Sequence, residues 1–258
     1  MLALVRGLRF SLKFIIEIRY MWSSMFSIII ATKNELNYIG RTLVILKRVL
    51  RGFKAEILVV DSSIDGTYEV AKKLADKAYR FKEEGLSKAR NYGAKRARGD
   101  ILVFMDADTI VSKKLFEEAL EAFKDPGVLA AVCYALPYSE ANFIQKTFYL
   151  LDSTYIKLCG RFPFLLRLYN RGDFFAVRRK AFFKVGGFDE NFHMMEITDL
   201  INRLMEYGKI AVLKSPAYES ARRLKKWGPI KNFLFWQPHY LSYFMLSRPL
   251  KIEYENVR

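Results

Sequence analysis

The sequence predicts an α/β fold with a Rossmann-like, mostly parallel central sheet flanked by helices. From residue 26 onward, short apolar runs alternate with segments of helical periodicity, as in a series of βαβ units. The runs are continuously apolar, which is typical of strands buried on both faces. Polar clusters directly follow three of them, and ligands bind beyond the carboxyl ends of strands in such sheets.

The first βαβ unit is expected to span two strands and one helix. Phe26–Ala31 (FSIIIA) and Glu56–Val60 (EILVV) are continuous apolar runs, which predicts buried strands. Between them, Asn37–Leu50 carries apolar residues at helical spacing, so we expect a helix that covers one face of the sheet.

The next elements are shorter. Asp65 and Gly66 precede Thr67–Ala75, and such residues are frequent at helix starts. A short strand is predicted over Ala78–Phe81 and a helix over Leu86–Arg98, which continues the alternation of strand and helix.

A further strand is predicted over Ile101–Met105 (ILVFM), an apolar run that is followed directly by an aspartate. Ser112 can cap a helix that extends through Phe123, because its hydroxyl can accept a bond from the first turn. Val128–Tyr134 is again strand-like.

After this strand the regular alternation of strands and helices is interrupted. Pro137–Asn170 is aromatic and rich in leucine, which predicts an insertion or a helical flap. Phe174–Val177 resumes a strand, Ile197–Tyr207 is expected to be a helix ended by Gly208, and Ile210–Leu213 is the last predicted strand.

These patterns divide the chain into three parts. Residues 1–24 form a basic amphipathic N-terminal extension, and residues 25–215 form the α/β domain. Within that domain, residues 25–110 are expected to bind a nucleotide and residues 111–215 an acceptor. Residues 216–258 form a C-terminal tail that is first basic and then aromatic.

The composition favours an anionic partner. Lysine and arginine outnumber the acids 43 to 27, a net charge of +16, which suits a phosphorylated substrate, anionic lipid or nucleic acid. Cys133 and Cys159 are too few for a disulfide framework or a cysteine-rich zinc site. No apolar run reaches the ~20 residues that a membrane-spanning helix needs, and charges interrupt any signal-peptide core at the N-terminus.

The triplet Asp106-Ala107-Asp108 is the first candidate for chemistry. Two carboxylates that flank one small residue repel each other, so their placement calls for a cation. Mg²⁺ and Mn²⁺ prefer such hard oxygen ligands and share them with substrate phosphates. A solvated turn that caps the next helix is the alternative for an isolated triplet of this kind.

The surrounding segments favour a metal site over a solvated turn at this triplet. They are ATKNE (Ala31–Glu35), VVDSSIDGT (Val59–Thr67), GLSKARNYGAKRARGDILVFMDADT (Gly85–Thr109) and GDFFAVRRKAFFKVGGFDE (Gly172–Glu190). In this order and spacing, residues 26–215 resemble the family 2 glycosyltransferases of GT-A fold. The resemblance implies an inverting transfer from a nucleotide diphosphate sugar, with Mg²⁺ or Mn²⁺ as cofactor.

The resemblance also implies roles for individual residues. Thr32 and Glu35 would hold the nucleoside, and Asp61 would contact the base or the ribose. Lys88, Arg90 and Asn91 lie in the segment that borders the nucleotide. Asp106 would contact the ribose or the metal, and Asp108 would bind the metal.

The acceptor half departs from the family pattern. Glu-Asp-x-Asp-Leu is the usual motif, whereas this chain reads Glu196-Ile197-Thr198-Asp199-Leu200, so Ile197 falls on the usual base. Either Glu196 or Asp199 acts as the catalytic base, or an ionised acceptor such as a polyprenyl phosphate needs none.

The tail adds a second basic cluster. Arg222 and Arg223 follow the last predicted strand and are expected to close over the diphosphate; an ordinary charged surface helix is the alternative. The aromatic residues of Phe233–Leu246 suit a membrane interface, or packing within the protein. His239 is expected to be buried or interfacial, with a place in the metal site as the alternative.

The predicted function is therefore a hexosyltransferase that uses a UDP- or GDP-sugar and a glycan or polyprenyl-phosphate-type acceptor. No nucleic-acid partner is expected. A sugar-phosphate nucleotidyltransferase is disfavoured because ATKNE lacks the glycine-rich loop that holds a triphosphate. A non-enzymatic module that binds anionic membranes or nucleic acid would leave the carboxylates at the strand ends unexplained. We expect a cytoplasmic protein with peripheral contact at the inner face of the cell membrane.

Overall fold

The computed structural model describes residues 24–138, 141–192 and 194–246. The strands are β1 (Phe26–Thr32), β2 (Ala55–Asp61), β3 (Lys77–Arg80), β4 (Ile101–Met105), β5 (Val128–Val132), β6 (Ala135–Pro137), β7 (Phe174–Arg178), β8 (Lys209–Val212) and β9 (Ala217–Glu219). The helices are α2 (Leu36–Val49), α3 (Thr67–Leu74), α4 (Leu86–Arg96), α5 (Lys113–Ala122), α6 (Phe143–Arg161), η1 (Pro163–Arg167, 3₁₀), α7 (Arg179–Lys184), α8 (Glu196–Leu204) and α9 (Arg222–Leu246). The N-terminal extension predicted over residues 1–24 lies, except for its last residue, outside the described part.

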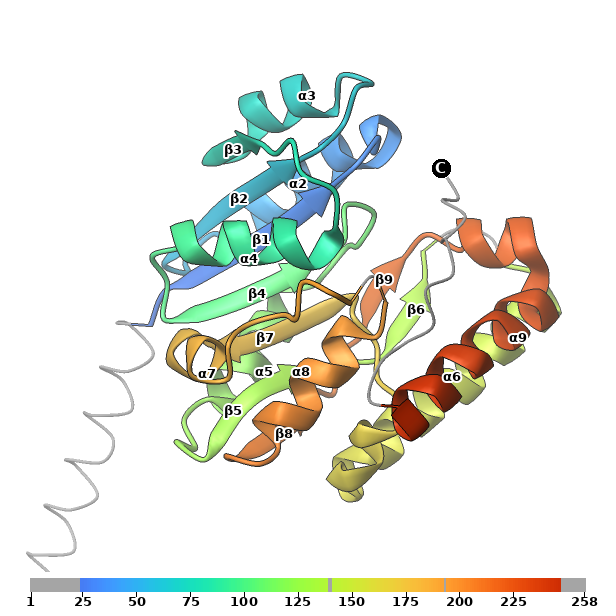
Figure 1. Cartoon of the computed structure of the whole chain (residues 1–258). Coiled ribbons are helices and arrows are strands. Elements are labelled where there is room, and N and C mark those ends of the chain that lie inside the picture. Colours follow the sequence, from blue (N-terminus) through green and yellow to red (C-terminus); the bar gives the residue numbers. More distant parts are fainter. Residues whose placement is uncertain (1–23, 139–140, 193, 247–258) are drawn as a thin grey trace, which may run out of the picture.

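The central sheet confirms the predicted α/β class. Its seven strands run in the order β3-β2-β1-β4-β7-β5-β8, and Figure 1 shows the twisted sheet with helices on both faces. All pairs are parallel except those that β7 makes with β4 and β5. Because β7 runs the other way, its first residue lies at the same edge as the last residue of β4.

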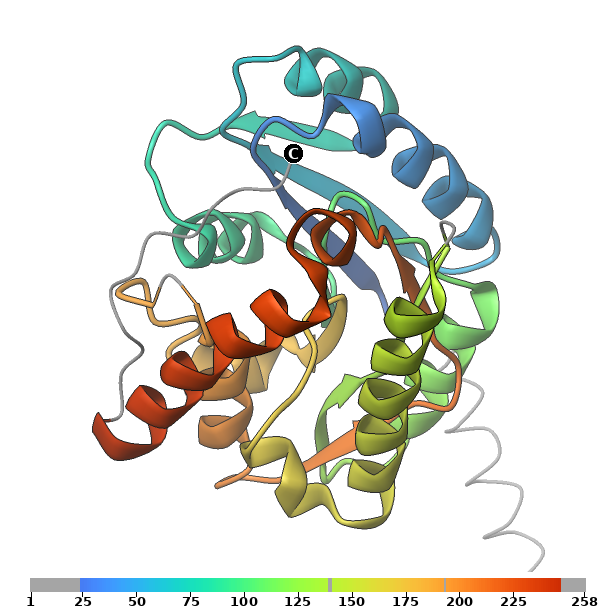
Figure 2. The same cartoon turned by 90° about the vertical axis from the view of Figure 1, so that its right-hand side faces the viewer.

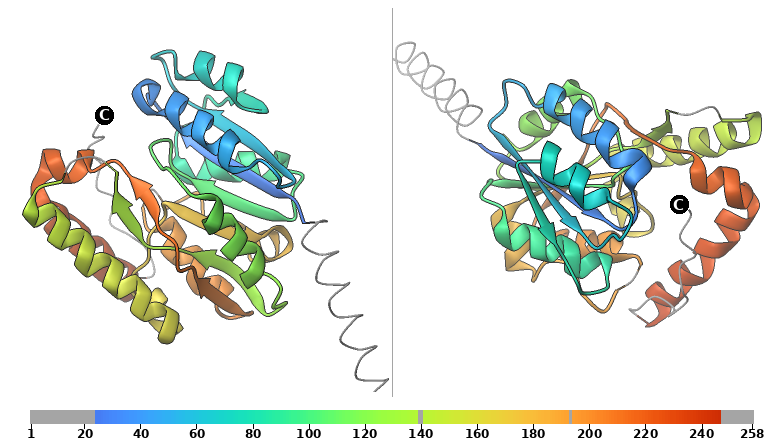
Figure 3. Two further views of the ribbon diagram at one scale, coloured as in Figure 1. Left: turned by 180° about the vertical axis from the view of Figure 1, so that it is seen from behind. Right: turned by 90° about the horizontal axis from the view of Figure 1, so that it is seen from above.

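Two apolar layers hold the helices on the sheet. On one face α2, α3 and α5 pack against alternate residues of the strands, such as Ile28 and Val103. On the other face α4, α7 and α8 cover Ile29, Leu102 and Phe104. Figure 1 shows α4, α7 and α8 in front of the sheet, and the view from behind in Figure 3 shows α2 and α5. Burial on both faces explains why these strands are continuously apolar.

The predicted insertion is mainly helix α6. Asn142 caps it through a capping box with Gln145, and α6 contacts β6, β8 and η1. Helix α9, which bends at Gly228, begins beside it, where Ala221 and Leu224 pack on Tyr149. In Figure 2 the two helices lie side by side, nearest the viewer, and diverge toward their carboxyl ends.

The division predicted at residue 215 does not coincide with a break in the structure. Strand β9 pairs with β6, and Tyr218 exchanges backbone hydrogen bonds with Ile110. Segments of three residues are too short to show a strand pattern, so β6 and β9 were not predicted as strands. No helix among the described residues combines the length and apolarity that crossing a membrane requires.

Candidate active site at the carboxyl edge of the sheet

The strand register brings the predicted polar clusters to one edge of the sheet. Thr32 pairs with Asp61 at the ends of β1 and β2. Asp106 directly follows Met105, which pairs with Ile30 of β1 and with Phe174 of β7. The antiparallel β7 therefore brings Asp173, the residue before it, to the same edge.

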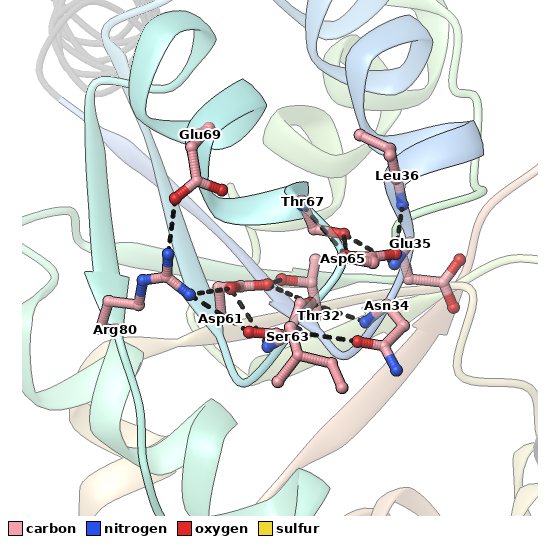
Figure 4. A network of polar contacts seen from close by, with 11 residues as sticks. Thr32, Asn34, Glu35, Leu36, Asp61, Ser63, Asp65, Thr67, Glu69 and Arg80 are labelled. Carbon is pink, nitrogen blue, oxygen red and sulfur yellow. Dashed lines mark hydrogen bonds and ion pairs between the residues drawn. The ribbon is translucent and has the colours of Figure 1, made fainter.

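The loops after β1 and β2 are tied to each other by side chains, as Figure 4 shows. The fully buried Asp61 carboxylate accepts hydrogen bonds from the Thr32 hydroxyl at 2.6 Å and from the Ser63 amide at 3.2 Å. The Asn34 amide donates to the Ser63 hydroxyl at 2.6 Å. Arg80 lies 3.9 Å from Asp61 and reaches Glu69 at 2.6 Å. Two loops fixed in this way form a pre-organised rim at the strand ends.

Helix α2 holds the centre of the carboxylate triplet. The Thr42 hydroxyl donates to the carbonyl oxygen of Ala107 at 2.6 Å, and both residues are buried. Ala107 packs into the core on this face of the sheet. The backbone between the two aspartates is thereby fixed, so Asp106 and Asp108 project from a rigid turn rather than from a solvated loop.

Arg90 links the first aspartate to the predicted base candidate Glu196. One guanidinium nitrogen, Nη1, lies 2.6 Å from Glu196 Oε1, and the other, Nη2, lies 3.0 Å from Asp106 Oδ1. The Arg90 side chain is only 2% exposed. A charge buried to this degree is costly unless it is paired, so α4, β4 and α8 meet at a fixed ionic contact.

Arg222 contacts Asp108, the second aspartate of the triplet. Its guanidinium makes two 2.8 Å bonds to Glu35, and its Nε lies 3.2 Å from Asp108 Oδ2. Burial raises the pKa of Asp108 to about 7, and the carboxylates of Asp106, Glu35 and Asp173 add to this while Arg222 opposes it. The ionised form of Asp108 therefore needs more positive charge than one arginine supplies.

This imbalance is the chemical argument for a cation at the site. Asp106 and Asp108 offer hard oxygen ligands, and the raised pKa of Asp108 falls when a cation binds beside it. The described residues contain no group of three histidine, cysteine or acidic side chains that could hold a metal by themselves. The residues thus fit Mg²⁺ or Mn²⁺ bound jointly with the phosphates of a substrate, which is how these ions commonly bind.

A buried polar cluster behind the site was not anticipated from the sequence. Arg171 contacts Asp152 at 3.1 Å, Asp173 at 2.7 Å and also Glu219. Although burial opposes it, the Arg171 guanidinium lowers the pKa of Asp173. Burial, together with the Asp173 carboxylate, raises the pKa of Glu219 well above its usual range. The cluster joins α6, β7 and β9, and the Gly172-Asp173 pair at a strand start was the only local signal.

Other predicted residues have contacts or exposure that do not involve Asp106 or Asp108. Asn91 binds the backbone of Phe188 in both directions, at 2.8 and 3.0 Å. Lys88 lies 3.3 Å from Glu83, and Arg223 is exposed. Asp199 pairs with Arg203 on its own helix. Asn91 and Asp199 line a separate cavity of about 480 Å³ beside α7.

The aromatic tail packs inward. Phe235, Trp236, Tyr240 and Tyr243 are partly buried against the segment that contains Phe192, Met194 and Met195. His239 is fully buried, and burial lowers its pKa. Its ring nitrogens have no hydrogen-bond partner among the described residues. The histidine thus lies in the aromatic packing layer, as predicted, rather than beside Asp106 and Asp108.

Comparisons with known proteins agree with this geometry. The model of the family "Glycosyl transferase family 2" matches residues 27–186. A dolichol-phosphate mannosyltransferase of Pyrococcus furiosus is 37% identical over 110 residues, which cover 40% of this chain and 31% of that protein. The chain thus matches only about a third of the length of this curated relative.

Solved structures share the fold at low sequence identity. A mannosyltransferase from Pyrobaculum calidifontis in complex with GDP-Man and Mn²⁺ has a TM-score of 0.61 at 18% identity, over 95% of this chain and 81% of that one. The glucosyl-3-phosphoglycerate synthase of Mycobacterium tuberculosis, in complex with Mn²⁺, UDP and glucosyl-3-phosphoglycerate, has a TM-score of 0.60 at 15% identity. The match covers 90% of this chain and 84% of that chain.

Proposed function

This chain belongs to glycosyl transferase family 2 and is a glycosyltransferase of GT-A fold. We propose that it moves a hexose from a nucleotide diphosphate sugar to a glycan or lipid-linked acceptor, with inversion. The proposal rests most on one observation. Asp108 is a buried carboxylate among other carboxylates, paired with Arg222, at the edge where β1, β2 and β4 end. Such a centre suits a divalent cation and a diphosphate.

The two halves of the donor would occupy different parts of the edge. The loops joined through Asp61 and Ser63 lie at the ends of β1 and β2, where Thr32, Glu35 and Asp61 would bind the nucleoside. Mg²⁺ or Mn²⁺ held by Asp106 and Asp108 would neutralise charge on the departing diphosphate. Arg222 lies between Glu35 and Asp108 and would donate an N–H to a phosphate oxygen of the donor.

Glu196 is the better placed of the two proposed bases. It shares Arg90 with Asp106, so its carboxylate lies one guanidinium away from the triplet. Asp199 instead pairs with Arg203 and borders the separate cavity. We propose that Glu196 accepts the proton of an acceptor hydroxyl as the hydroxyl oxygen attacks the anomeric carbon. An acceptor that is already an anion, such as a polyprenyl phosphate, would not need this step.

The donor is proposed to be a UDP- or GDP-sugar. The solved structures with this fold include complexes with GDP-Man and with UDP, and the Pyrococcus relative is named for a dolichol-phosphate acceptor. A lipid-linked acceptor would place the enzyme at the inner face of the cell membrane, in peripheral contact with it. The family match and the absence of a glycine-rich loop after β1 disfavour a sugar-phosphate nucleotidyltransferase.

A panel of nucleotide sugars tests the proposal. The full chain would be incubated with UDP- and GDP-linked hexoses and Mn²⁺ or Mg²⁺, and release of UDP or GDP would be measured with and without polyprenyl phosphate. We expect release from at least one donor, lost on chelation of the metal and accelerated by the acceptor. Release that persists unchanged in EDTA would contradict the proposed metal site.

A further inference from the structure

Helix α6 presents an apolar stripe to solvent. Ile144, Leu151 and Leu158 recur every seven residues, and all three are exposed. Phe143 and Leu150, which are 83% and 63% exposed, extend the stripe on the same side. The opposite face carries the buried contacts of the helix, including Tyr149, Asp152 and Ile156. Isolated exposed leucines are ordinary, but a continuous row on one helix is not.

Helix α9 carries a matching stripe. Ile230, Leu234, Leu241 and Met245 recur at helical spacing, and each is at least 61% exposed. The buried side of the same segment holds His239 and Ser242. Figure 2 shows the backbones of α6 and α9 nearest the viewer. We call these two stripes together the α6–α9 face.

The exposed charged side chains on the two helices of the α6–α9 face are of one sign. Helix α6 carries Lys146, Lys157 and Arg161, and its single acid, Asp152, is buried against Arg171. Residues 220–246 contain no acid. Apart from Arg222, which contacts Glu35 and Asp108, their cations are Arg223, Lys225, Lys226 and Lys231. Exposed apolar residues flanked by cations are what an anionic lipid surface binds.

We propose that the α6–α9 face docks on an anionic lipid bilayer, with its apolar stripes in the interfacial region and its cations at the headgroups. A second copy of this chain is the competing occupant. It would bring two rows of cations together, and a chain of net charge +16 gains nothing from that pairing. This surface differs from the aromatic residues predicted for membrane contact, because Trp236, Tyr240 and Tyr243 pack inward.

Docking in this way would bring the proposed active site close to the lipid surface. Helix α9 begins with Arg222, which contacts Glu35 and Asp108. The same helix thus reaches from the carboxylate centre to the α6–α9 face. The inference uses no step of the proposed reaction, so its failure would leave the proposed activity standing, and the reverse also holds.

A fluorescent probe can report which surface meets the lipid. Leu151→Cys and Leu241→Cys would each be labelled with an environment-sensitive NBD group in the full chain, since native Cys133 and Cys159 are buried. Val44→Cys, at a half-exposed apolar position on α2, is the control. With vesicles of phosphatidylcholine and phosphatidylglycerol, we expect a blue shift and increased emission at 151 and 241 but not at 44. Vesicles of phosphatidylcholine alone should give a much smaller change.

A matched pair of variants tests the energy of docking. Leu151→Glu with Leu241→Glu should weaken partitioning into the anionic vesicles at least about tenfold, since two apolar anchors are lost and negative charge is added. Val44→Glu with Tyr207→Glu, two exposed apolar positions elsewhere, should change it less than about twofold. Unchanged probes at 151 and 241 on vesicle-bound protein would overturn the proposal. So would a dimer in lipid-free sedimentation that the Leu151→Glu, Leu241→Glu variant converts to monomer.

Discussion

Asp108 is a carboxylate whose surroundings favour its protonated form when no cation is bound. Its pKa is raised to about 7 by burial, whereas the unfolded chain would titrate near 3.9. Between these values the folded state binds more protons than the unfolded state. Stability is therefore highest at acid pH with respect to this group, and falls as the pH rises from about 4 to 7.

Replacement of Asp108 by Asn should remove this loss of folding stability at higher pH. In metal-free buffer at pH 8 we expect Asp108→Asn to raise the free energy of unfolding by about 1–4 kcal/mol, with little difference from wild type near pH 4. Thermal unfolding at both pH values measures it. The variant should also lose transferase activity, a trade between stability and function. A variant less stable than wild type at pH 8 would show that Asp108 is held by favourable contacts instead.

Glu196 and Asp199 are close in the chain but have different partners, Arg90 and Arg203. Glu196→Gln should lower kcat by about a hundredfold or more with a neutral acceptor, because Arg90 would still hold Asp106 while the base is lost. Asp199→Asn is the matched control and should retain kcat within a few-fold, since its contact is with Arg203. Near-normal kcat in both variants would exclude a side-chain base and favour an ionised acceptor.

At the residue scale, sequence patterns located the strand-end carboxylates but not their partners. Thr32, Asp61, Asp106 and Asp108 could be placed because apolar runs end just before them. Arg90 was expected in the segment that borders the nucleotide, but its contact with Glu196 could not be predicted, since it joins residues 106 positions apart. The Arg171 cluster could not be predicted for the same reason, because three segments distant in the chain supply it.

Among the elements, α4 depends on a close approach to the sheet. A Cβ at Gly93 would lie 2.6 Å from Ile29 Cγ2 and 3.1 Å from Val60 Cγ2, both in buried strands. Gly93→Ala should therefore destabilise the protein by about 1–3 kcal/mol through overpacking. Gly40→Ala on α2 is the control. Its nearest atom is 3.4 Å away, so the gain in helix propensity should stabilise by about 0.5–1 kcal/mol.

Chemical denaturation of both glycine variants measures these values. Equal midpoints for Gly93→Ala and wild type would mean that α4 can move away from β1 without cost. In that case Arg90, on the same helix, would also be less firmly positioned than its contacts with Asp106 and Glu196 indicate.

Helix α9 is proposed to bring its first residue to the donor. Arg222→Ala should lower kcat/KM for the nucleotide sugar at least about tenfold, because a cation beside the diphosphate is lost. Arg223→Ala is the adjacent control and should stay within about twofold, as Arg223 is exposed. Steady-state kinetics with varied donor decides between them. Equal losses in the two variants would point to general electrostatic attraction rather than to the Glu35–Arg222–Asp108 contact.

Periodic elements were the most predictable part of the fold. The strand Ile101–Met105 has the predicted bounds, and Ser112 caps α5 as expected. Strands β6 and β9 have three residues each, and only their mutual pairing defines them. Helix α9 was not predicted, because Gly228 interrupts its pattern and aromatic residues lie on its buried side.

For the whole molecule, the antiparallel strand β7 explains why the site extends past the nucleotide half. It turns the chain so that Asp173 and the Arg171 cluster lie at the same edge as Asp106. Helices α6 and α9 extend beside that edge. A donor, a cation and an acceptor can thus meet where two halves of the chain join.

The central claim is that Asp106 and Asp108 bind a divalent cation together with a nucleotide diphosphate. Calorimetric titration of UDP and GDP into the full chain, with and without Mn²⁺, measures this directly. We predict that Mn²⁺ tightens binding of at least one nucleotide about tenfold or more. The gain should vanish in Asp108→Asn and persist in Asp125→Asn, an exposed aspartate that pairs with Lys209. Binding that is equally tight without Mn²⁺, or a gain that survives in Asp108→Asn, would contradict the account.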